Sequence, residues 1–466
     1  MVFSSVPFLY YFLPGCALLY FLAPRRLKNA ALLLCSLLFY AWGEPKYVLL
    51  LLFSIAQGYA AARIIERYRP RRIAAAARTA SVVLSLALLA VFKYAGFFLE
   101  SFRAITGLPV TVLRLALPAG ISFYTFQILS YVLDVWHGRA PAQRSFVNLA
   151  TYIAMFPQLI AGPIVRYTDI TEQLECRTVT LANAASGARR FAVGLAKKVL
   201  LADSLAAIGT AWRATAQPSV LFAWLYAVSF LLQIYFDFSG YSDMAIGLGR
   251  LFGFSFPENF NYPYISASIT EFWRRWHISL GTWFRDYLYI PLGGNRTSRA
   301  KWYRNLLIVW AATGLWHGAA WNFLLWGLLF AVLLIAEKQF LRPVLEKSRV
   351  FSHIYVLFFI TLSFVLFDAD SVSGAAGTLG ALFGAGGLAG ATQEALYLLR
   401  SNAILIAIAA VGATPLPKRV CSALEGSRAG ARVLSVLEPL GVLMLLVLCT
   451  AYLVDGTFSP FLYFRF

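Results

Sequence analysis

Charged residues are scarce in this chain of 466 residues, where only 13% are Asp, Glu, Lys or Arg. That is about half the fraction found in soluble domains, so the chain cannot cover a water-facing surface with polar groups. Acidic residues are the scarcer sign, with 21 Asp and Glu against 40 Lys and Arg, a formal net charge of +19. The mean hydropathy of +0.69 and a hydrophobic fraction of 60% exclude disordered, collagenous and coiled-coil chains. The class that fits is an all-α polytopic membrane protein.

Recognisable metal and catalytic motifs are also missing. The five cysteines are scattered and form no CxxC pair, which argues against a disulfide framework and against zinc. GxSxG, HExxH and P-loop motifs do not occur, and we expect no bound metal or cofactor. The glycine-rich stretch 384–389 matches a dinucleotide fingerprint formally, but it lacks the preceding strand and the following acidic residue, so it is better explained as a flexible loop.

Basic residues alternate with long apolar runs along the chain. Because Lys and Arg favour cytoplasmic loops, the excess positive charge indicates cytoplasmic flanks of membrane helices and not binding to nucleic acid. No Lys or Arg occurs between Arg349 and Arg400, so that segment is expected outside the cell, as are both termini. The first run, 6–23, has no preceding basic residue and is interpreted as a retained membrane segment. Apolar runs of spanning length lie near 6–23, 46–62, 79–99, 115–136, 191–212, 219–236, 351–367, 396–413 and 433–454, with shorter or broken ones near 30–42, 146–163 and 305–336.

Residues 237–304 form a polar region within this apolar chain. Repeated Pro and Gly predict short interfacial or re-entrant helices there, on the cytoplasmic side. One interpretation is an aromatic and basic belt at the membrane surface. The other is a cytoplasmic entrance for an anionic substrate, with candidate contacts Trp273, Arg274, Arg275, Arg285 and Arg296.

The run 305–336 is interrupted by the polar sequence Gly314-Leu-Trp-His317-Gly318. As one straight helix it would be about 48 Å long, which exceeds a hydrocarbon core of about 30 Å. Because basic residues flank both ends, we expect two arms that meet near 316–319 and hold His317 deep in the membrane; a tilted or kinked single helix is the alternative. A buried imidazole is neutral near pH 7, and ionisable residues inside membranes are commonly functional, although His317 could be a hydrogen-bonded core residue.

Several long and unusual blocks are distributed along the chain: FSSVPFLYYFLP, LLFYAWGEPKY, LPAGISFYTFQILSYVLDV, FPQLIAGPIVRY, FDFSGYSDMAIGLGRLFGF, ENFNYPY, FWRRWHISLGTWFRDYLYIPLGGNR, GLWHGAAWNFLLWG and PFLYFRF. Taken together, these blocks resemble the membrane-bound O-acyltransferase (MBOAT) family, in particular its bacterial alginate O-acetylation (AlgI-like) branch, which is related to the D-alanyl transferase DltB. The similarity extends over nearly the whole chain, which is expected to be a single domain, 1–466.

The resemblance implies a ring of about 10–12 membrane helices around a central tunnel, in the bacterial cytoplasmic (inner) membrane. It implies that His317 is the essential histidine and His277 a second, supporting one. The acyl donor would be cytosolic acetyl-CoA, and the acceptor a cell-envelope or exported polysaccharide reached through an extracytoplasmic SGNH-type O-acetyltransferase. Other functions remain open at this point: a transporter or flippase that binds an anion without covalent chemistry, or a scaffold that only recruits a partner.

The C-terminal segment 455–466 is predicted to be an extracytoplasmic tail, because a clean apolar span follows Arg432. The tail is largely aromatic and resembles the C-terminal motif of the DltX microprotein of the D-alanyl system. That resemblance implies that Tyr463 carries the acyl group; an interfacial aromatic anchor is the alternative.

Overall fold

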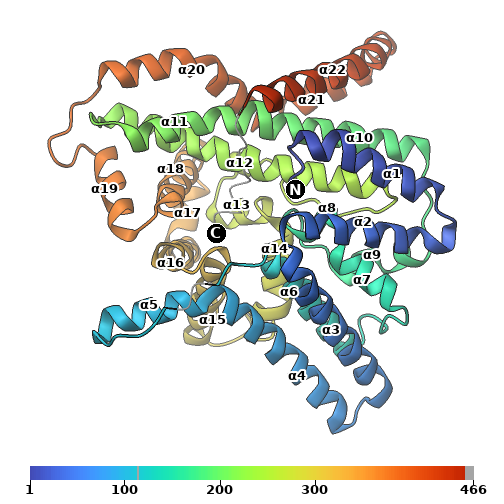
Figure 1. The fold of residues 1–466 in the computed structure, drawn as a ribbon. Coiled ribbons are helices and arrows are strands. Elements are labelled where there is room, and N and C mark those ends of the chain that lie inside the picture. Colours follow the sequence, from blue (N-terminus) through green and yellow to red (C-terminus); the bar gives the residue numbers. More distant parts are fainter. Residues whose placement is uncertain (113–114, 457–466) are drawn as a thin grey trace. The chain divides into compact units, whose positions relative to one another are not determined.

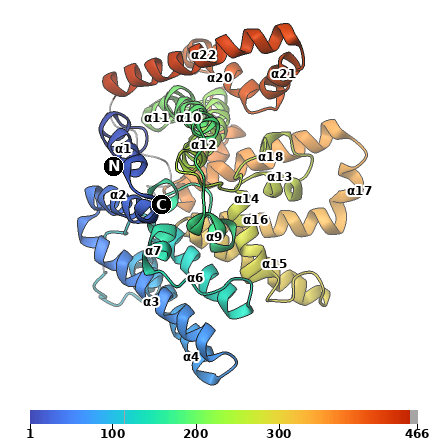
Figure 2. The same cartoon turned by 90° about the vertical axis from the view of Figure 1, so that its right-hand side faces the viewer.

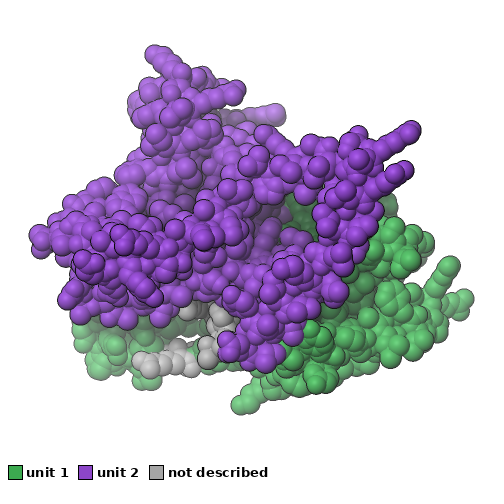
Figure 3. Space-filling model, turned by 90° about the horizontal axis from the view of Figure 1, so that it is seen from above, with its two compact units in different colours: residues 1–191, 242–258 green, residues 192–241, 259–466 purple. Residues whose placement is uncertain are grey.

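A computed structural model of the protein describes residues 1–112 and 115–456, and all regular secondary structure over these ranges is helical (Figure 1). The chain divides into two compact units, coloured separately in Figure 3. Unit 1 comprises residues 1–191 and 242–258, and unit 2 comprises residues 192–241 and 259–466. Two helices, α10 (Leu181–Ala196) and α12 (Val220–Leu251), continue from one unit into the other. The expectation of a single domain stays a prediction.

Unit 1 contains the helices of the N-terminal part of the chain. Its α3, α4 and α6 lie side by side in both Figure 1 and Figure 2. Glycines in the left-handed region delimit α6, with Gly120 before its first residue and Gly138 after its last. A Cβ on Gly120 would lie 2.4 Å from the carbonyl oxygen of Leu159, so this turn requires glycine for space as well as for φ. The helices of unit 1 are η1 (Phe8–Phe12), α1 (Leu13–Leu22), η2 (Arg25–Leu27), α2 (Lys28–Gly43), η3 (Pro45–Tyr47), α3 (Val48–Tyr68), α4 (Arg72–Leu89), η4 (Ala90–Tyr94), α5 (Ala95–Thr106), α6 (Ile121–His137), α7 (Phe146–Ala154), α8 (Phe156–Leu159) and α9 (Tyr167–Glu175).

Unit 2 contains the remaining helices, and many of them begin at a Ser or Thr that caps the first turn. The side-chain oxygens of Ser268, Ser348, Ser371, Thr392 and Ser427 each accept a hydrogen bond from a backbone N–H in the first turn of the helix that follows. The helices of unit 2 are η5 (Lys197–Ala202), α11 (Asp203–Ala214), η6 (Pro263–Ile265), α13 (Ile269–Arg275), α14 (Ile278–Phe284), η7 (Arg285–Tyr289), α15 (Arg299–His317), α16 (Trp321–Ala336), η8 (Glu337–Leu341), α17 (Arg342–Leu345), α18 (Arg349–Asp368), α19 (Val372–Leu382), α20 (Gln393–Gly412), α21 (Leu416–Glu425) and α22 (Arg428–Asp455).

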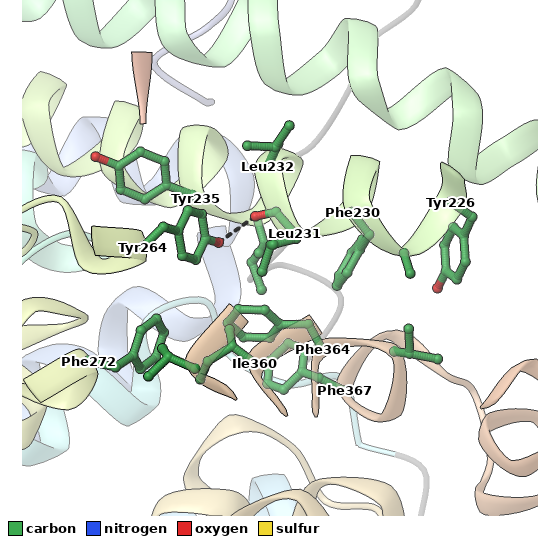
Figure 4. Close-up of a cluster of buried hydrophobic side chains, with 14 of the residues drawn as sticks. Tyr226, Phe230, Leu231, Leu232, Tyr235, Tyr264, Phe272, Ile360, Phe364 and Phe367 are labelled. Atoms are coloured by element: carbon green, nitrogen blue, oxygen red, sulfur yellow. Dashed lines mark hydrogen bonds between the residues drawn. The ribbon is translucent and has the colours of Figure 1, made fainter. Parts of the chain in front are cut away.

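The core of unit 2 is built between α12 and α18. Tyr226, Phe230 and Tyr235 of α12 line one side of the cluster in Figure 4, and Phe364 and Phe367 of α18 line the other. The Tyr264 hydroxyl donates to the backbone carbonyl of Leu231, which attaches the segment before α13 to the same helix (Figure 4). This core therefore holds in one unit the elements that carry both predicted histidines.

Within the described residues, seven helical segments are long and apolar enough to cross a membrane. This confirms the prediction of an all-α polytopic membrane protein. The expected total of about 10–12 membrane helices stays a prediction, because length and composition alone do not select shorter or more charged helices such as α15. The seven segments are Pro45–Tyr68, Arg72–Thr106, Val220–Leu251, Trp321–Leu345, Arg349–Asp368, Gln393–Gly412 and Arg428–Asp455.

The polar region 237–304 is only partly as predicted. Its first fifteen residues, 237–251, do not form separate short elements but continue α12 as a regular helix. The glycines in this stretch are tolerated because neighbouring backbone packs tightly against them: a Cβ on Gly240 would lie 2.7 Å from the carbonyl oxygen of Gly194. From residue 263 onward the expected succession of short helices is present, as η6, α13, α14 and η7.

Candidate active site

His317 is placed by a hairpin of two helices. It is the last residue of α15, and α16 begins four residues later at Trp321, so the run 305–336 is two helices and not one. The prediction of two arms meeting near residues 316–319 is confirmed. The arms approach most closely at glycines, because a Cβ on Gly327 would lie 2.2 Å from the carbonyl oxygen of Trp310 and one on Gly314 would lie 2.2 Å from that of Phe323.

Gly318 has a packing role next to His317. A residue without a side chain at this position would let substrate approach the histidine if the space beside it were open. In the structure, a Cβ on Gly318 would lie 2.2 Å and 2.3 Å from two ring atoms of Phe323. Its backbone is extended, with φ at −170°, so conformational freedom is not what requires glycine here. The space beside Gly318 is occupied by Phe323.

The His317 ring is enclosed by aromatic side chains and is 3% exposed. Its ring centroid lies 5.0 Å from that of Trp316, 5.0 Å from that of Trp326 on α16 and 5.4 Å from that of Phe367 at the end of α18. All three contacts are edge-on, an arrangement that aromatic rings prefer.

His277 lies beside His317, with 6.5 Å between the two ring centroids. It joins α13 to α14 and is 1% exposed. Its φ of +44° is in the left-handed region, which a residue with a bulky side chain adopts only when the surrounding structure enforces it. The ring packs edge-on against Phe238 of α12 at 4.7 Å and faces Trp316 at 5.7 Å. The structure thus brings together the two histidines that the sequence singled out, forty residues apart.

Asn259 determines which nitrogen of His277 carries the proton. Its side-chain Oδ1 lies 3.3 Å from the backbone nitrogen of Ser279, which can only donate, so this atom is the amide oxygen. The same oxygen lies 3.1 Å from His277 Nδ1 and also accepts a hydrogen bond from the Ser279 hydroxyl at 2.9 Å. Nδ1 must therefore be the protonated nitrogen, and Nε2 keeps its lone pair as an acceptor.

Burial keeps the His277 ring neutral. It lowers the pKa of this imidazole to about 3, because the charged form would lose its hydration. At neutral pH, His277 therefore presents an uncharged ring that accepts hydrogen bonds through Nε2. In this tautomer it cannot donate through Nε2 to a developing oxyanion.

The end of α18 is held in place behind His317. The side chain of Asp368 is buried and accepts hydrogen bonds from the hydroxyl of Tyr226 at 2.6 Å and from the guanidinium of Arg213. One residue on, the carbonyl of Ala369 accepts a hydrogen bond from the side chain of Asn322 at 2.7 Å. These contacts fix the backbone next to Phe367 and therefore fix its ring against His317.

The four candidate arginines are not equivalent. Arg275 pairs with Glu271 at 2.9 Å, and Arg285 pairs with the neighbouring Asp286 at 2.6 Å. Arg274 and Arg296 are exposed, and neither forms an ion pair among the described residues. Since an arginine already bound to a carboxylate is less available to a phosphate, Arg274 and Arg296 are the better candidates for an anionic ligand.

Trp273 packs inside unit 2, within the aromatic contacts between α13 and the hairpin. Its ring centroid lies 4.7 Å from that of Trp310, 5.7 Å from that of Trp326 and 4.9 Å from that of Phe330. These contacts attach α13 to the hairpin, and the role of Trp273 in donor binding stays a prediction.

Two further expectations concern Tyr463 and metals. Tyr463 lies outside the described residues, so its role as acyl carrier stays a prediction. Over residues 1–112 and 115–456, no group of three or more His, Cys, Asp or Glu residues is arranged to hold a metal ion.

Comparison with known proteins defines the family of this chain. The model of the membrane-bound O-acyltransferase family matches residues 139–367, a range that includes both buried histidines. The probable alginate O-acetylase AlgI of Azotobacter vinelandii is 41% identical over 507 aligned positions that cover all of both chains. The chain belongs to the membrane-bound O-acyltransferase family.

Other relatives of this membrane-bound O-acyltransferase act on different polymers, according to their names. The peptidoglycan O-acetyltransferase of Helicobacter pylori is 34% identical over 83% of this chain and 81% of its own length. The teichoic acid D-alanyltransferase of Bacillus subtilis is 31% identical over 47% of this chain and 59% of its own. This distribution confirms the resemblance inferred from the sequence, including the relationship to D-alanyl transferases.

Sequence reasoning missed several residues that shape the site of this acyltransferase. Asn259, Trp326, Phe367 and Asp368 come from four different segments, and no spacing rule connects them with His277 or His317. Asn259 lies within the block ENFNYPY, one of the sequences that carried the resemblance, but nothing in its neighbourhood indicates a hydrogen bond to a histidine eighteen residues away. Only the folded chain identifies these neighbours.

Proposed function

We propose that this acyltransferase transfers an acetyl group from cytosolic acetyl-CoA, across the bacterial cytoplasmic membrane, for O-acetylation of a cell-envelope or exported polysaccharide. The observation that carries the proposal is the pair of buried histidines 6.5 Å apart in an aromatic shell. The names of the relatives, an alginate O-acetylase and a peptidoglycan O-acetyltransferase, support acetyl as the group transferred and an envelope polymer as its destination.

The chemistry is acyl transfer from a thioester to a hydroxyl. His317 accepts the proton of the incoming hydroxyl while its oxygen attacks the thioester carbonyl. The C–S bond breaks, the thiolate leaves, and the proton passes from His317 to that sulfur, so that CoA is released as its thiol. His277, held by Asn259, accepts a hydrogen bond through Nε2 and orients the reacting groups. No residue of the chain is consumed, and no metal is required.

On the outer side of the membrane, we propose a partner enzyme and an acyl carrier. An extracytoplasmic SGNH-type O-acetyltransferase receives the acetyl group and passes it to the polymer, and both termini of this chain lie on that side. The Tyr463 hydroxyl is the acyl carrier between His317 and that partner. Its ester is an aryl ester, which is more reactive than an alkyl ester and therefore suited to onward transfer to a serine.

The test is to incubate purified protein with acetyl-labelled CoA and to measure release of CoA thiol and label on protein or partner. We expect His317→Ala to reduce CoA release by at least about 10²-fold, while the protein still inserts and purifies. His137→Ala is the matched control, because His137 is exposed and its Nδ1 contacts only the carbonyl of Leu133 one turn earlier. Unchanged label transfer in His317→Ala would remove this residue from the mechanism, and transport of an anion without transfer would favour the transporter alternative.

Tyr463→Phe tests the carrier separately, because it keeps the aromatic ring and removes only the hydroxyl. We expect acetylation of the external polymer to stop in this variant. Polymer acetylation at the normal rate would show that the tail is only an aromatic anchor.

A further inference from the structure

Glu337 carries a buried carboxylate and is not one of the residues that surround the two histidines. It is 4% exposed and lies where α16 passes into the wider turns of η8. Both of its carboxylate oxygens accept hydrogen bonds from the first turn of α13. Oε1 accepts from the backbone N–H of Ile269, and Oε2 accepts from the backbone N–H of Thr270 at 3.0 Å and from its hydroxyl at 2.8 Å.

These three hydrogen bonds attach α13 to the end of α16. A carboxylate is favourable at this end of a helix because the first N–H groups have no partner within the helix and carry partial positive charge. Ser268 caps the same turn by accepting from the backbone N–H of Glu271 at 3.0 Å. The first three backbone N–H groups of α13 therefore all have hydrogen-bond partners, and Glu337 is the partner that comes from another segment of the chain.

The helix that Glu337 holds leads directly to His277. α13 ends at Arg275, and His277 follows two residues later in its constrained left-handed conformation. α16, which carries Glu337 at its end, also carries Trp326, whose ring packs against His317 at 5.0 Å. The two histidine-bearing segments are thus connected through α16, at the Trp273–Trp326 contact of 5.7 Å and at Glu337.

We propose that Glu337 is a positioning residue of this active site, which fixes His277 relative to His317 by anchoring α13 to α16. The carboxylate touches neither histidine, so it acts only through the backbone of α13. The inference rests on the proposed function, since it assigns Glu337 to the catalysis that the two histidines perform. Its structural part, that the location of His277 depends on Glu337, can be measured without any assumption about the reaction.

Glu337→Gln is the direct perturbation. The amide has nearly the same shape, but its NH₂ group cannot accept, so at least one N–H of α13 loses its partner. A displacement of a reacting group by about 1 Å can reduce a rate by about 10²-fold, so we expect the turnover number for CoA release to fall by about 10- to 100-fold. The KM for acetyl-CoA should also rise, because Arg274 lies on α13 and is displaced with that helix. Glu346→Gln is the matched control, since Glu346 is exposed and pairs only with Arg342 at 2.7 Å.

Thr270 provides a second perturbation that spares the buried carboxylate. Thr270→Val keeps the branched shape and removes the hydroxyl that donates to Glu337, whereas Thr270→Ser keeps that hydroxyl. We expect Thr270→Val to lower the turnover number in the same direction as Glu337→Gln, and Thr270→Ser to restore it. This pair decides the question if Glu337→Gln fails to fold.

Diethyl pyrocarbonate provides a measurement independent of activity, because it modifies accessible neutral imidazole rings. Modification of each histidine can be quantified by mass spectrometry of its peptide. His277 should resist the reagent in the wild type and in Glu346→Gln, and should become reactive in Glu337→Gln and Thr270→Val. If His277 stays protected and turnover is normal in both of these variants, the proposal is wrong even where His317→Ala is inactive. If His277 becomes reactive but His317→Ala still turns over normally, the anchoring stands and the proposed function fails.

Discussion

Replacing Gly327 by alanine tests whether the close approach of α15 and α16 positions His317. A Cβ at this position would lie 2.2 Å from the carbonyl oxygen of Trp310 and 3.1 Å from the Cα of Gly314, where ordinary contact begins at 3.4 Å. Both neighbours are backbone atoms, which cannot rotate away as a side chain can. The two helices must therefore separate by about 1 Å, a shift that can cost a rate about 10²-fold.

The same overlap gives an expected loss of stability. Inserting a methyl group into a closely packed contact typically costs about 1–3 kcal/mol. We expect Gly327→Ala to lower the thermal unfolding midpoint in detergent and to reduce CoA release by about 10²-fold. The loss of activity should persist well below the unfolding temperature, because it arises from displacement of His317 relative to Trp326 and not from unfolding.

Gly441→Ala is the matched control in α22. A Cβ there meets no atom within 4 Å, so the substitution adds helix propensity without overlap. We expect this variant to keep wild-type activity with an unchanged or slightly raised unfolding midpoint. If Gly327→Ala matched Gly441→Ala in both measurements, the hairpin contact would not be what positions His317.

Three further predictions follow from charged and titratable groups. Burial lowers the pKa of His277 from 6.5 to about 3. Between these two pH values the unfolded chain binds a proton that the folded chain does not. The contribution of His277 to the free energy of unfolding is therefore fully present above pH 6.5, and it falls by about 1.4 kcal/mol per pH unit below that pH. Thermal unfolding at pH 7 and pH 5 should show this loss in the wild type and less of it in His277→Gln; equal losses would contradict it. Lys198→Met removes the ammonium group that lies 2.8 Å from the buried carboxylate of Asp237. We expect it to lower the free energy of unfolding by about 3–5 kcal/mol. The second change Asp237→Asn should recover part of that loss. Arg274→Glu should raise the KM for acetyl-CoA about tenfold. Arg285→Glu should not, because the guanidinium of Arg285 is already bound to the neighbouring carboxylate of Asp286. Equal KM values in the two variants would remove Arg274 from the donor site.

The sequence by itself determined the class of the protein and its two central residues. A charge content too low to cover a soluble surface, together with long apolar runs, is sufficient to predict a helical membrane protein, because the bilayer tolerates few other backbone arrangements. The hairpin was also predictable: an apolar run of 32 residues with basic ends and a polar interruption does not fit one crossing. His317 was recognisable because a histidine within an apolar run is rare, and both His317 and His277 because the blocks around them resemble a known family.

Only the tertiary structure shows which residues hold those histidines in place. The protonated nitrogen of His277 depends on Asn259, and the location of His277 depends on Glu337, sixty residues further along the chain. Such contacts join segments that are distant in sequence, and a single sequence shows no periodicity or spacing that connects them.

The structure also gives a packing reason for two residues that the sequence analysis named. At position 318 a side chain would overlap with the ring of Phe323, so only glycine fits there without a shift. At position 273 the large ring of tryptophan fills the contact between α13 and the hairpin. The sequence shows that such a residue stands out, but the reason for its identity is the set of atoms that pack against it. Those atoms are brought together by folding, which is why packing, tautomer and ion pairing could not be determined from the order of the residues alone.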